Sequence, residues 1–367
     1  MRRNAQTLRT VVGAKTATAF VVKSNAYGHG LVETALAIEP LANRICVYGL
    51  DEALELREGG VTAPLMVMGP VEPERLDDAV AAGVEIPLWD TKNFVRDVHV
   101  AAQNRQTRAR VHIKVNTGLN RLGIEPHDVA DAVEDYLRIS NIEIAGIFSH
   151  LAAAEEIDSP YTNYQLDRFK EACVQAAPLF ASAGIEPVRH IAASAAAMLW
   201  PQTRLDMARI GIALYGLWPS EATRVAMNGN AIDLEPALTY TSSLVVAHEV
   251  PAGASIGYGS TFHAPRAMRI GVVPLGYADG IPRLLSNRGA FIVDGARCPI
   301  IGRIAMNMTV IDLTHAPRAR VGSTVTLIGR EGDAAVTADD WATWSETINY
   351  EIVTRLPAEL TRVYSED

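Results

Sequence analysis

The chain has 367 residues, enough for two or three domains, or for one large closed α/β barrel with a further domain. Hydrophobic residues make up 49% and charged residues 20%, which is typical of a compact globular protein and excludes a disordered or fibrous one. The formal net charge of −9 at pH 7 disfavours nonspecific binding to nucleic acid or to an anionic membrane.

The three cysteines, Cys46, Cys173 and Cys298, are far apart in the sequence and odd in number. This pattern indicates neither a disulfide framework nor a CxxC metal site. No apolar run approaches the ~18 to 20 residues of a membrane span, and polar residues follow Arg3 where a signal peptide would be apolar. We therefore expect a reducing, cytoplasmic location.

Short apolar runs alternate with amphipathic stretches between residues 20 and 217. The stretch 51–60 predicts a helix that Asp51 can cap, and 73–83 and 163–180 predict helices as well. The apolar runs are 20–22, 45–50, 64–69, 85–89, 110–115, 142–150, 188–194 and 205–212. Eight buried parallel strands joined by helices predict a closed (β/α)8 TIM-type barrel, and a doubly wound open sheet is the alternative.

Beyond about residue 235 the helical period gives way to alternating β-like runs separated by turn residues. The runs are 239–250, 269–278, 289–295, 308–314 and 323–329. They predict a separate, mostly antiparallel β domain, so that the fold class is α/β plus β. With the boundary in the polar stretch 220–236, the domains would span 1–230 and 231–367.

Three motifs of other chemistries are incomplete. The segment Gly253–Gly257 fits G-x-S-x-G, but a nucleophile elbow needs a strand before it and a helix after it, and here a turn precedes and a strand-like run follows. Lys15 lacks the glycines of a phosphate-binding loop. The nine histidines include no HExxH pair and no cluster with cysteine, so we expect no metal site.

Lys23 stands where the first apolar run ends. Catalytic groups of a parallel barrel lie at the C-terminal ends of its strands, which makes this amine a candidate site residue. A lysine at a strand end is otherwise most often a solvated side chain, so the motifs around it and farther along the chain decide between the two interpretations.

The segment VVKSNAYGHG (21–30) resembles the pyridoxal-phosphate lysine motif of the alanine racemases, which usually has alanine in place of Ser24. Further blocks resemble that family, in its order, over nearly the whole chain. They are KVNTGLNRLG (114–123), FSHLAAAEE (148–156), HIAASAAAM (190–198), ARIGIALYGL (208–217), SIGYGSTF (255–262), PLGYADG (274–280), IGRIAMNM (301–308) and INYEIVTRL (348–356). The resemblance implies a barrel followed by a β domain, in agreement with the division found from periodicity.

The resemblance also implies that Lys23 carries pyridoxal 5′-phosphate, a cofactor that delocalises the charge left when the α-proton of an amino acid is removed. Racemisation needs a proton carrier on each face of the substrate. By resemblance Lys23 is one, and Tyr258 from the other subunit of a homodimer is the second.

Other roles carry over in the same way. Arg209 would bond the pyridine nitrogen, and His150 would link Arg209 toward the catalytic tyrosine. Because a guanidinium does not readily give up a proton, the ring would be a weaker electron sink with fewer side reactions. The implied phosphate-binding groups are Tyr27, Ser194, the backbone amides of Gly211 and Ile212, and Tyr350.

On the substrate side, the resemblance places Arg121 near the substrate carboxylate, which the amide of Met306 would also contact. Lys114 matches a lysine that is carbamylated in many members of the family. A carbamate would hold Arg121, whereas an unmodified Lys114 would repel it. Tyr277, Met306 and the two tyrosines already named would crowd the site, leaving room for little more than a methyl side chain.

The match is imperfect at several positions. Asn116 and Asn307 replace the usual aspartates, and Leu119 and Phe262 replace a methionine and a tyrosine. We expect Asn307 to change the charge or pH optimum of the pocket. The family also places a strand of the C-terminal domain before the segment that matches 2–9, so either the start is misassigned or the β domain closes differently.

The sequence therefore predicts a dimeric alanine racemase that uses pyridoxal phosphate and supplies D-alanine for peptidoglycan. One alternative is a racemase of the same fold acting on serine or on a basic amino acid. Another is a noncatalytic pyridoxal-phosphate-binding protein that shares only the barrel, and the long β domain bearing Tyr258 and Met306 argues against it. Carbamylation of Lys114 and a biosynthetic or catabolic role stay open.

Overall fold

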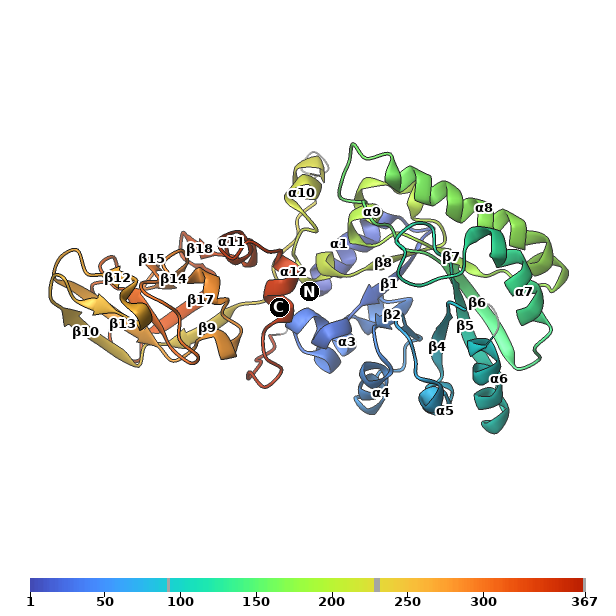
Figure 1. The fold of residues 1–367 in the computed structure, drawn as a ribbon, viewed down its shortest axis with the longest axis horizontal. Helices are drawn as coiled ribbons and strands as arrows, with labels where there is room; N and C mark the ends of the chain where they lie inside the picture. The colour runs from blue at the N-terminus through green and yellow to red at the C-terminus, as the bar shows by residue number, and fades with distance from the viewer. Residues whose placement is uncertain (91–92, 228–231, 366–367) are drawn as a thin grey trace. The chain divides into compact units, whose positions relative to one another are not determined.

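A computed structural model of the chain describes residues 1–90, 93–227 and 232–365. The chain forms two compact units (Figure 1). Unit 1 comprises Met1–Ala26 and Gly30–Pro236, and unit 2 comprises Tyr27–His29 and Ala237–Asp367. The predicted boundary between residues 230 and 231 lies outside the described residues.

Unit 1 is built on eight parallel strands. Their order is β7-β6-β5-β4-β3-β2-β1-β8, and backbone hydrogen bonds from Asp206 N to Arg189 O (3.1 Å) and from Arg209 N to Ala192 O (3.0 Å) join the two ends of this order. The strands are β1 Ala17–Val21, β2 Arg44–Val47, β3 Leu65–Val67, β4 Val84–Leu88, β5 Ala109–Lys114, β6 Ile142–Phe148, β7 Val188–His190 and β8 Met207–Ile210. The predicted eight-stranded barrel is confirmed, and the open sheet is excluded.

The barrel strands are short and buried on both faces. All residues of β3 and β4 are buried, as are four of the five in β1. Helices cover the outside of the ring (Figure 1). Continuous apolar runs are required because side chains also fill the interior of such a barrel. This double burial is why each strand could be located from the sequence to within a few residues.

Helices connect the strands, and three of the connections follow the predicted stretches. The helices of unit 1 are α1 Arg2–Val12, α2 Lys23–Gly28, α3 Leu31–Ile38, α4 Leu50–Glu58, α5 Leu76–Ala81, α6 Phe94–Asn104, α7 Val129–Leu137, α8 Tyr161–Ser182, α9 Ser194–Leu199 and α10 Glu221–Met227. The expected capping role of Asp51 was wrong. Gly49 is the N-cap of α4, and Glu52 accepts from the backbone N–H of Tyr48 (2.9 Å) and of Gly49 (3.3 Å).

Unit 2 contains antiparallel sheets, as predicted. The strands are β9 Tyr240–Ser243, β10 Val246–Val250, β11 Ser255–Ile256, β12 Phe262–His263, β13 Met268–Val273, β14 Ala290–Val293, β15 Ala296–Pro299, β16 Thr309–Asp312, β17 Thr324–Glu331 and β18 Ala334–Val336. Sheets form in the orders β10-β13-β16, β11-β12 and β15-β14-β17-β18, with β9 beside β17. Two short helices, α11 Ala338–Trp344 and α12 Asn349–Thr354, follow the strands.

The predicted run 239–250 is two strands instead of one. Leu244 N donates to Ser323 O at the start of β17, whereas Val245 N donates to Val272 O in β13, both at 3.0 Å. The chain therefore passes from one sheet to another at these two residues. No glycine or proline separates the two strands, so the sequence carried no sign of the change of partner.

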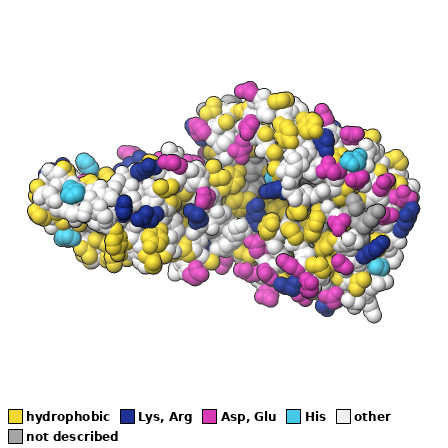
Figure 2. Space-filling view, viewed as in Figure 1, with side chains coloured by type: hydrophobic (Ala, Val, Ile, Leu, Met, Phe, Trp, Pro, Cys, Tyr) yellow, Lys and Arg dark blue, Asp and Glu magenta, His cyan; other side chains and the backbone are white. Residues whose placement is uncertain are grey.

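The surface and the helices agree with the composition. Figure 2 shows acidic and basic side chains interspersed over the visible face. None of the helices within the described ranges combines the length and apolarity needed to cross a bilayer. Cys46, Cys173 and Cys298 are all free thiols.

Candidate active site

Lys23 opens a segment with an uncommon backbone. It follows Val22 at the C-terminal end of β1, and the next four residues, Ser24–Tyr27, have φ angles of 54°, 53°, 51° and 52°. These values belong to the left-handed helical region, which costs an L-residue roughly 1 to 2 kcal/mol. Four in succession store strain directly beside the candidate amine, a pattern found at functional sites.

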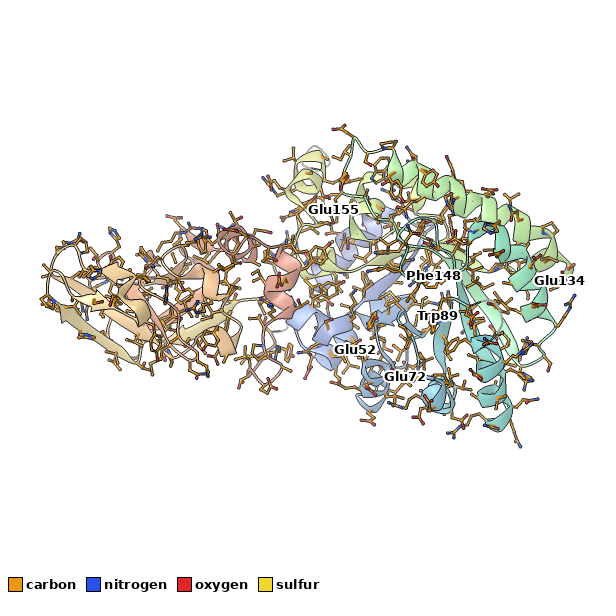
Figure 3. The ribbon with its side chains drawn as sticks, in the orientation of Figure 1. Glu52, Glu72, Trp89, Glu134, Phe148 and Glu155 are labelled. Atoms are coloured by element: carbon orange, nitrogen blue, oxygen red, sulfur yellow. The ribbon has the colours of Figure 1, made fainter. Side chains whose placement is uncertain are left out.

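Glu52 anchors this left-handed turn, and its role was not foreseen. Its Oε1 accepts from Ser24 N at 2.5 Å, while its Oε2 accepts from Tyr48 and Gly49 at the start of α4. One carboxylate thus ties the turn after β1 to the connection after β2. The side chain lies near the strand ends in Figure 3. The only signal in the sequence was the capping position of a glutamate at the start of a helix.

The turn is also held by Asn25. Its side-chain oxygen accepts from Leu31 N at 2.9 Å, and its carbonyl accepts from Gly30 N at 3.0 Å. These bonds fix the loop that leads into α3. The backbone direction after Lys23 is therefore set on both sides of the strained residues.

Four cationic side chains influence one another at this end of the barrel: Lys23, Lys114, Arg121 and Arg209. Burial lowers the pKa of Lys23, and the charges of Arg121 and Arg209 lower it further against the opposing effect of Glu52. Burial and the same two arginines lower the pKa of Lys114 to about 8. Across the described ranges, no carboxylate forms an ion pair with any of the four. An anionic ligand would supply the missing charge.

A hydrogen bond joins Arg209 and His150. Arg209 is 3% exposed in β8, and its Nη2 donates to Ser149 O (2.8 Å) and to His150 Nδ1 (3.3 Å). Burial lowers the pKa of His150, and Arg209 and the other nearby cations lower it further, to about 3. His150 is thus a neutral imidazole that accepts at Nδ1 and carries its proton on Nε2.

The ring of Phe148, at the end of β6, lies close to two of the four cations, Lys114 and Arg209. Its ring centroid lies 5.5 Å from Lys114 Nζ and 5.5 Å from Arg209 Cζ. The ring is also stacked on His190, with centroids 5.0 Å apart and an interplanar angle of 4°. Figure 3 labels Phe148 among the barrel strands. The aromatic face offers partial compensation for the clustered positive charge.

Ser194 and Gly211 lie together at the ends of β7 and β8. Gly211 N donates to Ser194 Oγ at 3.0 Å, which leaves the hydroxyl proton of Ser194 available for another acceptor. Ile212 follows at the start of a 3-10 turn and is 1% exposed. The hydroxyl and this backbone turn are the polar groups that could receive a phosphate here, while the Gly211 amide is used by Ser194.

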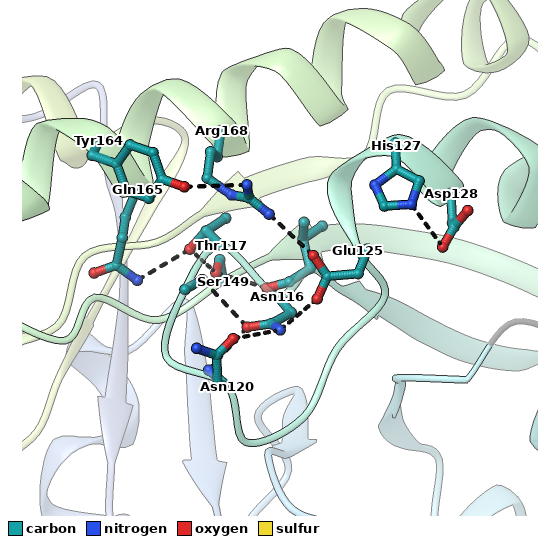
Figure 4. A network of polar contacts seen from close by, with 12 residues as sticks. Asn116, Thr117, Asn120, Glu125, His127, Asp128, Ser149, Tyr164, Gln165 and Arg168 are labelled. Carbon is teal, nitrogen blue, oxygen red and sulfur yellow. Dashed lines mark hydrogen bonds and ion pairs between the residues drawn. The ribbon is translucent and has the colours of Figure 1, made fainter.

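The loop that carries Arg121 is held by an amide group that an aspartate could not replace. Asn116 Oδ1 accepts from the N–H groups of Gly118 (3.3 Å) and Asn120 (3.0 Å). Its Nδ2 donates to Glu125 Oε1 at 2.6 Å, and Glu125 pairs with Arg168 (Figure 4). Asparagine in place of the usual aspartate at position 116 therefore provides a donor for the carboxylate of Glu125.

We predict that Asn116→Asp destabilises this chain, although aspartate is the usual residue there by resemblance. Two carboxylates would face each other and Glu125 would lose a donor, at a cost of about 1 to 3 kcal/mol in the free energy of unfolding. The KM for amino-acid substrate should rise as the Arg121 loop shifts. Denaturant unfolding of this variant, of Glu125→Gln and of the double variant measures the coupling. Additive effects would show that the pair does not hold the loop.

A second group of bonds joins the Arg121 loop to the strand end that bears His150. Gln165 of α8 is 0% exposed, and its Nε2 donates to Thr117 Oγ1 (3.2 Å) and to His150 O (3.1 Å). The hydroxyls of Thr117 and Ser149 lie 2.8 Å apart, and a dashed line marks this hydrogen bond in Figure 4. The ends of β5 and β6 therefore form one connected polar layer.

The remaining predicted residues belong to unit 2. The rings of Tyr27 and Tyr350, both predicted phosphate ligands, lie with centroids 6.3 Å apart. Tyr277 N donates to Ala305 O, and Ala278 N donates to Met306 O, both at 3.0 Å, so Tyr277 and Met306 lie on adjacent segments. Tyr258 is 71% exposed in a turn between two glycines with positive φ.

Comparison with known proteins places these features in a family. A model described as "Alanine racemase, N-terminal domain" matches residues 1–219, and one described as "Alanine racemase, C-terminal domain" matches residues 237–364. The chain belongs to the alanine racemase family. The alanine racemase of Symbiobacterium thermophilum is 38% identical over 99% of this chain and 94% of that protein.

Solved structures of alanine racemases share the fold. The enzyme from the D-cycloserine producer Streptomyces lavendulae superposes with a TM-score of 0.91 at 36% identity, covering 100% of this chain and 94% of that one. The enzyme from Streptomyces coelicolor gives a TM-score of 0.89 at 34% identity, covering 100% of this chain and 96% of that one. The similarity to alanine racemases thus extends over both units.

Proposed function

We propose that the chain interconverts L- and D-alanine, with pyridoxal 5′-phosphate bound at Lys23. The observation that carries this proposal is the group of Lys23, Lys114, Arg121 and Arg209, whose charges influence one another and none of which forms an ion pair with a described carboxylate, in a chain that matches the alanine racemase models over both units. A dianionic phosphate and a substrate carboxylate suit such a group.

The residues present fit the cofactor. Lys23 offers an amine whose pKa is lowered by burial, which increases its neutral, nucleophilic fraction. Arg209 would face the ring nitrogen, and the phosphate would be held by Tyr27, Ser194, Ile212 and Tyr350, with the Gly211 amide acting through its hydrogen bond to Ser194. When bound, pyridoxal phosphate supplies delocalisation of the charge that remains after the α-proton leaves.

The proton transfers would be made by two side chains. Lys23 Nζ takes or returns a proton on one face of the substrate, and the hydroxyl of Tyr258 does so on the other. The exposure of Tyr258 in a single chain supports its contribution to the site of a partner subunit in a homodimer, as does the exposure of Met306 at 56%. Arg121 and the backbone N–H of Met306 would hold the substrate carboxylate.

Lys114 is the candidate for carbamylation. A lysine reacts with carbon dioxide as the neutral amine, and a pKa of about 8 gives Lys114 a larger neutral fraction at neutral pH than an ordinary lysine has. The product would be an anion among cations, which would orient Arg121.

We place the racemisation of alanine in the cytoplasm, where D-alanine would be supplied for peptidoglycan.

Substrate selection tests the proposal. Crowding by Met306, Tyr258, Tyr277 and Tyr350 predicts that L-alanine is preferred over L-serine by about 10- to 200-fold in kcat/KM, with L-lysine and L-arginine nearly inert. Stereoinversion of the four amino acids by the holoenzyme, followed by chiral chromatography, gives these ratios. A basic amino acid outperforming alanine would assign the chain to another racemase of this fold, and inversion of none of them would support the noncatalytic alternative.

A further inference from the structure

A chain of buried polar side chains runs through the interior of the barrel to Arg209. Arg209 Nη1 lies 2.8 Å from His190 Nδ1, His190 Nε2 lies 3.0 Å from His112 Nδ1, and His112 Nε2 lies 2.9 Å from Glu85 Oε2. The exposed fractions are 3% for Arg209, 0% for both histidines and 1% for Glu85. Four polar groups in succession are thus fully withdrawn from water.

The chain spans the barrel from one end to the other. Glu85 is the second residue of β4, and its other partners are Arg44 (2.6 Å), the first residue of β2, and Arg110 (3.2 Å), the second residue of β5. Arg209 lies near the C-terminal end of β8. An ion cluster at the N-terminal ends of the strands is therefore connected to the end that bears Lys23.

The direction of every hydrogen bond in this chain is determined by its two ends. A guanidinium can only donate and an ionised carboxylate can only accept. His190 must therefore accept at Nδ1 and donate from Nε2 to His112, which in turn accepts at Nδ1 and donates from Nε2 to Glu85. Although burial raises the pKa of Glu85, His112 and Arg44 lower it to about 2. Burial lowers the pKa of both histidines, so each is neutral.

The space around His112 is shaped for an imidazole. A Cβ on Gly146 of β6 would lie 2.3 Å from His112 Nδ1, so only glycine leaves room for the ring in this position. The other ring of the chain, His190, is stacked on Phe148. Neither ring can turn over without displacing a neighbour.

We propose that Glu85, His112 and His190 are positioning residues that hold the Arg209 guanidinium in a single orientation through a one-way hydrogen-bond chain. The functional part of this inference rests on the proposed function, in which Arg209 bonds the ring nitrogen of pyridoxal phosphate. The predicted tautomers of His112 and His190 do not depend on the proposed function.

Histidine tautomers provide the first test. The chain contains nine histidines, so nitrogen NMR of protein labelled with ¹⁵N-histidine is tractable, with signals assigned from His112→Phe and His190→Gln. In the apoprotein, between pH ~6 and ~8, both rings should be neutral with the proton on Nε2. A proton on Nδ1 of either ring, or on both nitrogens, would overturn the chain. This readout requires neither cofactor nor activity, so it remains informative even if the proposed function is wrong.

Two variants then break the chain at different points. Glu85→Gln removes the acceptor charge, and His112→Phe removes the link while leaving the Glu85 ion pairs in place. We expect each to loosen the His190 ring that holds Arg209 and to lower kcat about tenfold, with KM for alanine changed less than twofold. The absorption spectrum of bound pyridoxal phosphate should also shift.

The matched control is Arg110→Gln, which removes an ion pair of the same carboxylate but no bond of the chain. We expect wild-type tautomers and a kcat within about twofold of wild type. If Glu85→Gln does not fold, the kcat of His112→Phe and the histidine tautomers of the wild-type protein still test the proposal. If a folded variant with a broken hydrogen-bond chain has the wild-type kcat and absorption spectrum, the proposal is wrong. Glu85, His112 and His190 then only pack in the core.

Discussion

Replacing Lys23 by alanine should abolish alanine racemisation, with a loss of roughly 10⁴-fold or more in kcat/KM. Only an amine at this position can hold the cofactor covalently and also carry a proton at the substrate. The site of attachment can be verified directly because the chain has only five lysines, Lys15, Lys23, Lys92, Lys114 and Lys170. Borohydride reduction with pyridoxal phosphate, followed by peptide mapping, should label the Lys23 peptide.

The control for this experiment is Lys170→Ala. Lys170 is an exposed lysine of α8, 4.0 Å from Asp167, and its removal should leave racemisation and labelling unchanged. A Lys23→Ala protein that is folded and still reductively labelled at wild-type yield would contradict the assignment. Loss of racemisation alone would be weaker support, because strain in the left-handed turn could also change with the side chain.

Tyr258→Phe should retain bound pyridoxal phosphate but lose about 10²- to 10⁴-fold in kcat, the usual contribution of a general acid or base. Without the hydroxyl, one face of the substrate has no proton carrier, while Lys23 still serves the other. Solvent deuterium should therefore enter one enantiomer of alanine much faster than the other. Tyr164→Phe, which removes the hydroxyl of a half-exposed tyrosine of α8, should behave as wild type.

Mixing the two inactive variants tests whether the site is shared between subunits. In randomly recombined dimers of Lys23→Ala and Tyr258→Phe, half are mixed and each mixed dimer holds one intact site, so about one quarter of wild-type activity should return. Subunit exchange can be followed with differently tagged chains. Exchange without recovery would indicate that the site is completed within one chain, and equal deuterium entry from both enantiomers would contradict the two-face assignment.

The barrel was predictable because most residues of its strands are buried on both faces. The run that became β4 is apolar at almost every position, and the polar stretches between such runs bound the helices. The buried chain of Glu85, His112, His190 and Arg209 could not be predicted from these apolar runs. His112 lies within β5 and His190 is the last residue of β7, and nothing in the sequence relates them to each other or to Glu85, since the three come from different strands.

The local geometry at Lys23 could not be predicted for a different reason. Ser24, Asn25, Ala26 and Tyr27 have no intrinsic preference as a group for positive φ, and the carboxylate that ties the turn in place comes from Glu52, 28 residues after Ser24. A residue of this kind is found only when two strand ends are placed side by side. Motif resemblance proposed Lys23 as the site residue, whereas the backbone direction after it became clear only from the fold.

The left-handed turn also limits how this chemistry could be transplanted. A lysine grafted onto the strand end of another barrel would be followed by ordinary right-handed or extended backbone, which would aim its side chain elsewhere. A working graft would have to transfer residues 23–28 together with a carboxylate in the position of Glu52, as one cassette. Building that cassette with D-alanine at position 26, where the mirror-image residue favours the observed φ of 51°, should yield a more stable turn than the natural L-residue.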